Sequence, residues 1–273
     1  EHYLSTNHIL MIGMIVTFIL TFFLLEHPFS FLPSDQGRAF AVNGSLSKGK
    51  LRGVGFIFVL CFLISSVLFL PIDVEYVIYA ILLFAMMISG YLDDASKTPW
   101  NEYKKGLIDL VISIVAVLTY MNFNSTTICF GADEIVIPKA LFLILGVILI
   151  WVSVNVTNCT DGVDGLCASL CSVTLLAFGV LFAPILQKYA MANFLFLSVL
   201  FAYLYFNSSP SSMLMGDAGS RALGFYIAVI ALKSTHPFIY ILLAAVMIVD
   251  GGIGLVKICL LYTSPSPRDR QKS

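Results

Sequence analysis

Residues 140–166 read ALFLILGVILIWVSVNVTNCTDGVDGL, an uncharged apolar run that ends in a polar break holding two aspartates. A helix needs about 20 predominantly apolar residues to cross a bilayer, and the run reaches that length once its uncharged flank is counted. Similar runs lie near 9–25, 54–72, 76–92, 110–122, 166–187, 189–206, 222–232 and 238–249. The sequence therefore predicts an all-α fold, a polytopic transmembrane helical bundle with nine visible spans.

The composition excludes an ordinary soluble domain. Of 273 residues, 59% are hydrophobic and 11% are charged, and the mean hydropathy is +0.95, whereas a soluble domain carries about 25% charged residues. The net charge is −1 and no basic block is present, so nothing points to a nucleic-acid partner. The six cysteines form neither a CxxC pair nor a zinc-site spacing, and we expect no disulfide. The first apolar run lacks the flanking signals of a cleavable signal peptide.

The loops between the runs fall into two groups of unequal charge. The segments that follow odd-numbered spans share one side, and they are 26–53, 93–106, 156–165, 207–220 and the stretch after Lys257. The basic residues in these segments or directly beside them are Arg38, Lys48, Lys50, Arg52, Lys97, Lys104, Lys105, Arg221 and Lys257. The opposite loops hold Lys139, Lys188 and Lys233. The positive-inside rule places the more basic side in the cytoplasm, so we expect the N-terminus outside.

Five aspartates lie in three of these same-side breaks, where a membrane protein carries acids at a cost. They are Asp93 and Asp94 in GYLDDASK, Asp161 and Asp164 in NVTNCTDGVDGL, and Asp217 in MGDAGSRALGF. Taken singly, each has an ordinary interpretation as an interfacial cap, a polar turn or a helix N-cap. Taken together on one face, they are hard oxygen ligands of the kind that binds Mg²⁺ beside substrate phosphates.

Residues near these aspartates add groups suited to phosphate. The loop before the second span supplies cations, namely Lys48, Lys50 and Arg52. Lys97 lies one helical turn after the aspartate pair, where it can balance charge or hold a phosphate. Gly162 permits a tight turn in which backbone N–H groups approach a phosphate or nucleotide. Asn158 precedes that turn, and Asn207 lies where the seventh span meets the same side.

The ordered set of motifs resembles the polyprenyl-phosphate N-acetylhexosamine-1-phosphate transferase superfamily over roughly residues 30–258. The motifs are SKGKLRGVG (47–55), DDASK (93–97), NVTNCTDGVDGL (155–166), FNSSP (206–210) and MGDAGS (215–220). Within the superfamily, Lys97 and the Gly106-Leu107 pair favour the phospho-N-acetylmuramoyl-pentapeptide transferase (translocase I) branch. The first motif resembles a variant found among Firmicutes, in which Lys50, Leu51 and Arg52 stand where a KxGTPTMGG loop has Thr-Pro-Thr.

The resemblance implies an enzyme of the bacterial plasma membrane with ten transmembrane helices and its active site on the cytoplasmic face. It implies Mg²⁺-dependent transfer of phospho-MurNAc-pentapeptide from UDP-MurNAc-pentapeptide to undecaprenyl phosphate, a membrane lipid, giving lipid I and UMP. The reaction belongs to peptidoglycan synthesis, and so to cell-wall biogenesis, cell shape and cell division. A homodimer is one oligomeric state to consider, which the sequence leaves open.

The resemblance also implies roles for single residues. Asp217 matches the magnesium ligand, Asp93 and Asp94 match the pair that binds or activates the lipid phosphate, and Lys97 supports the phosphate site. The substrate-binding positions are Asn158, Asp161, Gly162, Asp164, Asn207 and Lys48, with Asp164 near the uracil. We expect direct attack by the lipid phosphate, with Asp93 as the base or orienting group, rather than an aspartyl-phosphate intermediate.

The end of the chain departs from the helical pattern. Residues 259–273 read CLLYTSPSPRDRQKS and resemble a translated sequencing adapter, so we expect the transferase domain to occupy 1–258. A histidine-containing loop and a tenth span, which the resemblance implies, would follow 258. The chain's own histidines, His2, His8, His27 and His236, match no position in that loop. We therefore expect residues 1–273 to be inactive or badly impaired.

Three other functions compete with this interpretation. A UDP-N-acetylglucosamine-1-phosphate transferase would share the fold, and UMP release with each UDP-sugar separates the two. A secondary transporter or cation channel would also carry intramembrane acids, but such sites usually lie near the bilayer midplane, whereas these acids lie in loops on one face. A purely structural membrane protein gives no reason for five same-side carboxylates.

Overall fold

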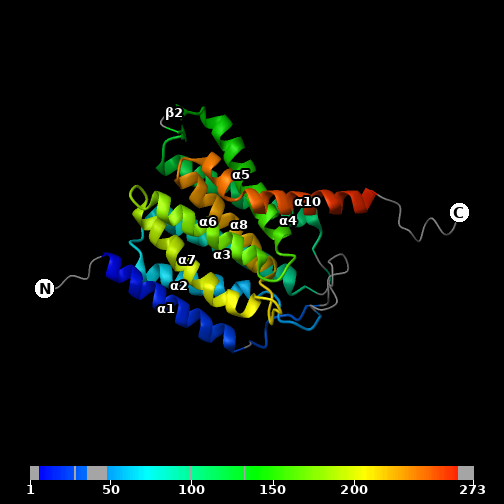
Figure 1. Ribbon diagram of the computed structural model, residues 1–273. Coiled ribbons are helices and arrows are strands. Elements are labelled where there is room, and N and C mark those ends of the chain that lie inside the picture. Colours follow the sequence, from blue (N-terminus) through cyan, green and yellow to red (C-terminus); the bar gives the residue numbers. More distant parts are fainter. Residues whose placement is uncertain are drawn as a thin grey trace.

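The computed structural model describes residues 6–27, 29–35, 48–96, 98, 100–131 and 133–263. The helices are α1 (Thr6–Glu26), α2 (Gly55–Phe69), α3 (Val74–Asp94), α4 (Glu102–Phe123), α5 (Lys139–Thr160), α6 (Leu166–Phe182), α7 (Gln187–Asn207), α8 (Gly216–Lys233), α9 (Pro237–Leu243) and α10 (Ala245–Thr263). They pack side by side as a bundle, with α1 along one edge and α10 extending away from the body (Figure 1).

The helices confirm a polytopic helical membrane protein. Those long and apolar enough to cross a bilayer are α1, α3, α4, α5 and α7, and α2 and α6 are shorter apolar helices. Each of the first eight predicted runs corresponds to one helix. The short run near 222–232 extends through the MGDAGS motif as expected, because α8 begins at Gly216. The total of nine membrane spans stays a prediction.

Two features differ from the sequence-based expectation. The ninth run is split, because α9 ends at Leu243 and α10 begins at Ala245. The helix α10 then continues to Thr263, past residue 258, where we expected the helical pattern to stop. The origin of residues 259–273 and the domain boundary at 258 stay predictions.

A short hairpin joins α4 to α5 and was not predicted. Strands β1 (Thr127–Phe130) and β2 (Asp133–Val136) pair antiparallel, with Cys129 opposite Glu134. Its residues are partly or fully exposed, and apart from this loop element the described residues form an all-α fold. Strands of four residues give little periodic signal, which explains why the sequence did not reveal them.

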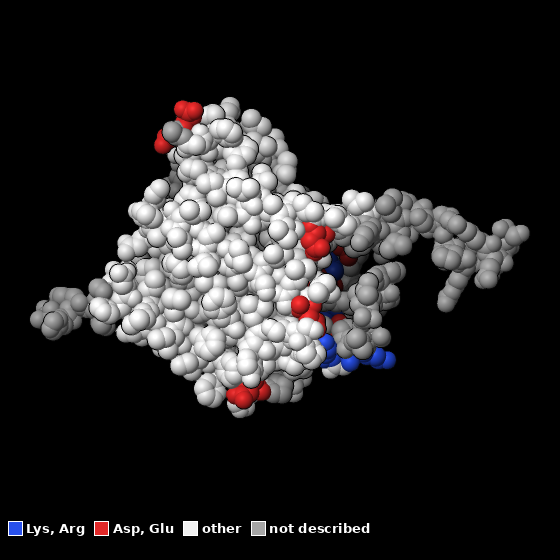
Figure 2. Space-filling model, in the orientation of Figure 1, with Lys and Arg blue, Asp and Glu red and all other residues white. Residues whose placement is uncertain are grey.

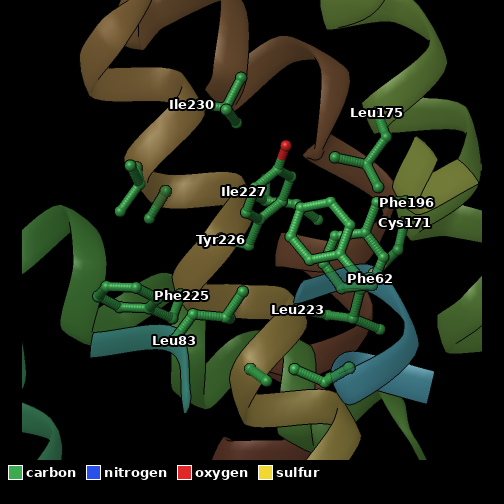
Figure 3. Packing of buried hydrophobic residues seen from close by; sticks show 14 of the residues in the cluster. Phe62, Leu83, Cys171, Leu175, Phe196, Leu223, Phe225, Tyr226, Ile227 and Ile230 are labelled. Atoms are coloured by element: carbon green, nitrogen blue, oxygen red, sulfur yellow. The ribbon is translucent and has the colours of Figure 1, made fainter. Parts of the chain in front are cut away.

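Helix α8 forms the centre of the bundle, and every one of its residues is buried. It packs against α3, α5, α2 and α6. Around its middle, Tyr226 lies edge-on to Phe62 of α2 and Phe196 of α7, whose rings stack with centroids 4.2 Å apart (Figure 3). The middle of α8, residues 222–232, is uncharged and apolar, as expected for a helix buried on all sides.

Glycines allow the helix ends near α8 to approach backbone to backbone. A Cβ added to Gly90 of α3 would lie 2.4 Å from the carbonyl carbon of Asp217, and one added to Gly55 of α2 would lie 2.1 Å from the backbone nitrogen of Gly219. Small residues at such crossings let membrane helices pack closely. The C-terminal end of α3 and the N-terminal ends of α2 and α8 therefore meet at one point.

Candidate active site

Three aspartates converge at that meeting point. Asp93 and Asp94 end α3, and Asp217 lies in the first turn of α8. Asp94 Oδ2 accepts a hydrogen bond of 3.1 Å from the backbone N–H of Ala218, which ties the end of α3 to the start of α8. The side chain of Asp94 is fully buried, so this contact fixes the relative position of the two helices.

Arg52 contacts three carboxylates at once. Its Nε donates to Asp94 Oδ1 at 2.8 Å, its Nη1 donates to Asp35 Oδ1 at 3.2 Å, and its Nη2 donates to Asp217 Oδ1 at 3.4 Å. Burial by itself would lower the pKa of Arg52, but the charges of Asp94, Asp217 and Asp35 raise that pKa above its ordinary value. The guanidinium therefore keeps its charge throughout the physiological pH range.

Lys105 bridges Asp93 and Asp217, the second of which Arg52 also contacts. Its Nζ lies 2.6 Å from Asp93 Oδ2 and 3.3 Å from Asp217 Oδ2. The backbone N–H of Trp100 donates to Asp93 Oδ1 at 2.6 Å, which holds that carboxylate from the opposite side. Together, Arg52 and Lys105 neutralise part of a cluster with more acids than bases, and Asp217 contacts both cations.

A second group of contacts lies in the DGVDG loop. Asp164 Oδ2 accepts from the backbone N–H of Ser211 at 3.1 Å and lies 3.6 Å from Lys50 Nζ, which donates to Ser211 Oγ at 2.8 Å. Burial alone would raise the pKa of Asp164, but the hydrogen bonds from Ser211 and the charge of Lys50 lower it. Asp164 is therefore anionic at neutral pH and fastens its loop to the segment before α8.

Asn207, at the end of α7, joins the same two loops. Its Oδ1 accepts from the backbone N–H of Gly165 at 3.0 Å, and its Nδ2 donates to the carbonyl of Met213 at 2.9 Å. Gly165 has φ +76°, a conformation that glycine adopts at little cost. Buried Asn207 thus holds the DGVDG turn against the loop that leads to Asp217.

The remaining predicted residues lie at the margin of the cluster or outside the described chain. Asn158 Oδ1 accepts from Ser220 Oγ at 2.8 Å, which links the end of α5 to α8. Asp161 caps α5 with a half-buried side chain, and Gly162 is exposed in the next turn. Lys48 is exposed and makes no hydrogen bond or ion pair with the described residues. Lys97 lies outside the described residues, so its expected contact with the phosphate site stays a prediction.

The sequence pattern predicts Arg52 as one of three loop cations suited to phosphate, but it indicates no site role for Lys105. The structure adds Lys105 to the cluster. A signal for Lys105 was available, because it opens a span on the same side as the aspartates. The structure also favours Lys50 over Lys48 as the loop lysine that faces Asp164.

The arrangement suits a divalent cation bound together with an anionic substrate. Within the described residues no group of three or more His, Cys, Asp and Glu forms a ready metal cage. Mg²⁺ usually takes one or two carboxylates and completes its shell with water and phosphate oxygens. Asp217 could be such a carboxylate. Its two oxygens contact Arg52 and Lys105, and a bound metal ion would either sit beside these cations or replace one of them.

The charged groups lie at one end of the bundle. The cluster draws on the C-terminal ends of α3, α5 and α7 and on the N-terminal ends of α2, α4 and α8, as an up-and-down helix order requires. Most charged atoms visible in Figure 2 gather along one margin of a broad uncharged face, with further acidic atoms over the hairpin. The same-side prediction for the aspartates is consistent with these contacts.

Comparison with known proteins finds relatives along nearly the whole chain. Residues 76–235 match the family model for glycosyl transferase family 4. A phospho-N-acetylmuramoyl-pentapeptide-transferase of Treponema pallidum is 35% identical over 272 residues, which cover 92% of this chain and 75% of the relative. Proteins of the same name from Halalkalibacterium halodurans and Dictyoglomus turgidum are 28% and 25% identical, each covering 89% of this chain and 81% and 80% of the relative.

Proposed function

The chain belongs to glycosyl transferase family 4, and from that premise we propose that it is a phospho-N-acetylmuramoyl-pentapeptide transferase. It transfers phospho-MurNAc-pentapeptide from UDP-MurNAc-pentapeptide to undecaprenyl phosphate, giving lipid I and UMP. The observation that carries the proposal is the alignment, over nearly the whole chain, with relatives that bear this name. The same-end cluster of carboxylates and cations supports a site for two phosphate substrates.

The chemistry requires two anions to meet, so charge neutralisation and alignment supply most of the rate enhancement. An oxygen of the lipid phosphate attacks the β-phosphorus of the UDP-sugar, the bond from that phosphorus to the UMP oxygen breaks, and UMP leaves. Asp217 would hold Mg²⁺, which would supply neutralising charge to the diphosphate and to the leaving group. Arg52 and Lys105 are the cations that contact Asp217, and on substrate binding they would exchange carboxylate partners for phosphate oxygens.

Asp93 is the group that orients the lipid phosphate. Its carboxylate is held by the N–H of Trp100 on one side and by Lys105 on the other, so it presents a fixed acceptor at the end of α3. Asp94 serves as a positioning residue, because both its oxygens are engaged by Arg52 and Ala218. On the nucleotide side, Asp164, Lys50 and Ser211 form a polar edge that Asn207 holds in place.

We further propose that this end of the bundle faces the cytoplasm and that the N-terminus lies outside. The excess of basic residues in the same-side loops supports that orientation. The hairpin between α4 and α5 then lies on the outer side.

The proposal is tested by measuring UMP release from the intact gene product, purified in detergent, with each UDP-sugar and undecaprenyl phosphate. We expect release only with UDP-MurNAc-pentapeptide, and we expect EDTA to abolish it and Mg²⁺ to restore it. Release with UDP-N-acetylglucosamine instead would assign the chain to the sister activity. Solute transport without Mg²⁺-dependent UMP release would refute a transferase, and a trapped phospho-enzyme would refute direct attack.

A further inference from the structure

A second buried ion pair lies beneath the carboxylate cluster. Asp109 of α4 and Arg221 of α8 are 2% and 1% exposed, and Arg221 Nη2 donates a short hydrogen bond to Asp109 Oδ1. Asp109 lies outside the motifs that predicted the site chemistry, and Arg221 directly follows the MGDAGS motif. Arg221 is the largest fully buried side chain among the described residues, so its charge needs a physical account.

The pair is in register with the site above it. Asp109 lies four residues after Lys105 on α4, and Arg221 lies four residues after Asp217 on α8. Residues four apart lie on the same face of a helix, one turn below the other. Since Lys105 contacts Asp217 at 3.3 Å, the two helices are joined by two successive ion pairs.

The two pairs have opposite polarity. In the pair nearer the loops, α4 gives the cation and α8 the anion, whereas in the deeper pair α4 gives the anion and α8 the cation. Each helix therefore carries neighbouring opposite charges, and Arg221 also attracts the Asp217 carboxylate one turn earlier on its own helix. This alternation fixes both the spacing and the rotation of α4 against α8.

Stability alone does not explain the deeper pair. A buried ion pair costs desolvation energy that a well-packed apolar pair avoids, and replacing such a pair with apolar side chains is often neutral or stabilising. Arg221 Nε and Nη1, moreover, have no hydrogen-bond partner among the described residues, and unsatisfied buried donors add a further cost. Two hydrophobic residues at these positions would give the folded protein at least the same stability.

We propose that Arg221 and Asp109 are positioning residues that hold Asp217 and Lys105 at the spacing needed to bind the divalent cation. This inference rests on the proposed function, which gives the reason why the site would bind a divalent cation. Its test, however, uses metal binding, which does not depend on the identity of the sugar nucleotide.

The decisive variant is the double substitution Asp109→Leu with Arg221→Met, which replaces the ion pair with apolar side chains. We expect a Tm equal to or above that of the wild type, together with Mn²⁺ binding about tenfold weaker, as is typical when a group supporting a metal ligand is lost. Mn²⁺ binding is measured by electron paramagnetic resonance on the purified intact gene product. The Mg²⁺ concentration for half-maximal UMP release should rise in parallel.

A matched control exists at the other end of α8. Lys233 Nζ lies 2.9 Å from Glu75 Oε2, and both residues are buried. The double substitution Glu75→Gln with Lys233→Met removes this pair far from the cluster. We expect it to lower Tm and to leave Mn²⁺ binding unchanged, so a general loosening of α8 is separated from a local effect on Asp217.

Polarity gives a second test. Exchanging the charges, with Asp109→Arg and Arg221→Asp, keeps an ion pair but places like charges next to Lys105 and Asp217. We expect Mn²⁺ binding to stay weak, whereas a purely structural pair would be restored. The Arg221→Lys variant keeps the charge and its partner, so we expect it to avoid the tenfold loss of Mn²⁺ binding.

Wild-type Mn²⁺ affinity in the apolar double variant overturns the proposal, as does full recovery on charge exchange. If the apolar double variant does not fold, the Arg221→Lys variant tests the proposal instead. A tenfold loss of Mn²⁺ binding in that variant, at an unchanged Tm, contradicts the positioning role. If the wild type binds Mn²⁺ but releases no UMP with any UDP-sugar, the proposed function fails while the positioning inference stands.

Discussion

At the scale of single residues, the site depends on side chains that hold several partners at once. Arg52 contacts Asp35, Asp94 and Asp217, and Lys105 contacts Asp93 and Asp217. Because guanidinium groups present several donors in a rigid plane, Arg52 can fix three carboxylates from distant parts of the chain. These cations keep the acids together without substrate, and they are placed to receive phosphate when substrate binds.

Asn207 illustrates how one amide can support a binding site without touching the chemistry. Replacing it with alanine leaves the N–H of Gly165 and the carbonyl of Met213 unpaired, at a cost of about 1–3 kcal/mol. We expect Asn207→Ala to lower Tm and to raise the KM for UDP-MurNAc-pentapeptide. Both are measured on the detergent-purified intact gene product.

The control for that variant lies on the same helix. Asn193 is buried and accepts a hydrogen bond of 2.9 Å from Tyr226, so Asn193→Ala should lower Tm without raising KM. If Asn207→Ala lowers Tm as much as Asn193→Ala does and leaves KM unchanged, Asn207 has a structural role only.

The stability of the DGVDG turn should not change with pH between about pH 8 and pH 5. The pKa of Asp164 is lower in the folded protein than in the unfolded chain, so its stabilising contribution is present above the unfolded value of about 3.9. That contribution is lost as the pH falls through the folded pKa. Hydrogen exchange, corrected for intrinsic rates, should show constant protection of residues 161–165 from about pH 8 to pH 5.

Protection should fall only under more acidic conditions, and Asp164→Asn should remove that fall because it cannot titrate. A marked loss of protection between pH 7 and pH 5 in the wild type would mean that another group controls the turn.

At the scale of elements, the site exists because three helix ends approach more closely than side chains would allow. Gly55, Gly90 and Gly219 provide the contacts between α2, α3 and α8. Helix α3 is fixed at its start by Asp73, which accepts from the N–H of Tyr76 at 2.8 Å, and at its end by the bond from Ala218 to Asp94. The positions of Asp93 and Asp94 are therefore consequences of helix packing.

Substituting Gly90 tests this packing directly. In Gly90→Ala, the new Cβ would lie 2.4 Å from the backbone of Asp217, so α3 must move away from α8. Overpacking of this kind costs about 1–3 kcal/mol, and we expect a lower Tm together with weaker Mn²⁺ binding. The control is Gly252→Ala on α10, where a Cβ meets nothing within 4 Å.

Gly252→Ala should raise stability by up to about 1 kcal/mol through helix propensity, with no effect on metal binding. A Gly90→Ala protein with wild-type Tm and Mn²⁺ affinity would show that the close approach of α3 and α8 is not needed.

At the scale of the whole molecule, polar groups gather at the two ends of an apolar body. Helices α3 and α8 run antiparallel, with Asp94 beside Ala218 at one end and Glu75 paired with Lys233 at the other. The 18 residues of α8 span about 27 Å at 1.5 Å per residue, close to the ~30 Å hydrocarbon thickness of a bilayer. This length fits the proposal that the two charged networks lie near opposite membrane surfaces.

This arrangement predicts which loops a reagent can reach. We introduce single cysteines at Glu134 in the hairpin and at Gly162 in the DGVDG turn, both exposed, in a background without native cysteines. A membrane-impermeant maleimide applied to spheroplasts should label Glu134→Cys and spare Gly162→Cys, whereas lysed cells should label both. The reverse pattern would invert the proposed orientation.

The sequence by itself determined the parts of this protein that depend on local composition. An apolar run of span length forms a helix wherever it lies in the chain, because no other structure short of a closed barrel satisfies backbone groups in lipid. The eight single-helix runs, the common side of the five aspartates and the family motifs all follow from such local or additive features. The hairpin and the break at Ala244 were missed because their local signals are weak.

Only the tertiary structure decided which charges meet. Lys105 and Asp217 are 112 residues apart, and Arg52 and Asp94 are 42 apart, so their pairing depends on helix packing and rotation. Helix packing also sets the two hydrogen bonds of Asn207 to Gly165 and Met213. It brings Lys50, rather than Lys48, close to Asp164, and it forms the deeper ion pair of Asp109 and Arg221. Charge on a side chain can be read locally, but the free energy of bringing two charges together depends on a distance that only the packed helices set.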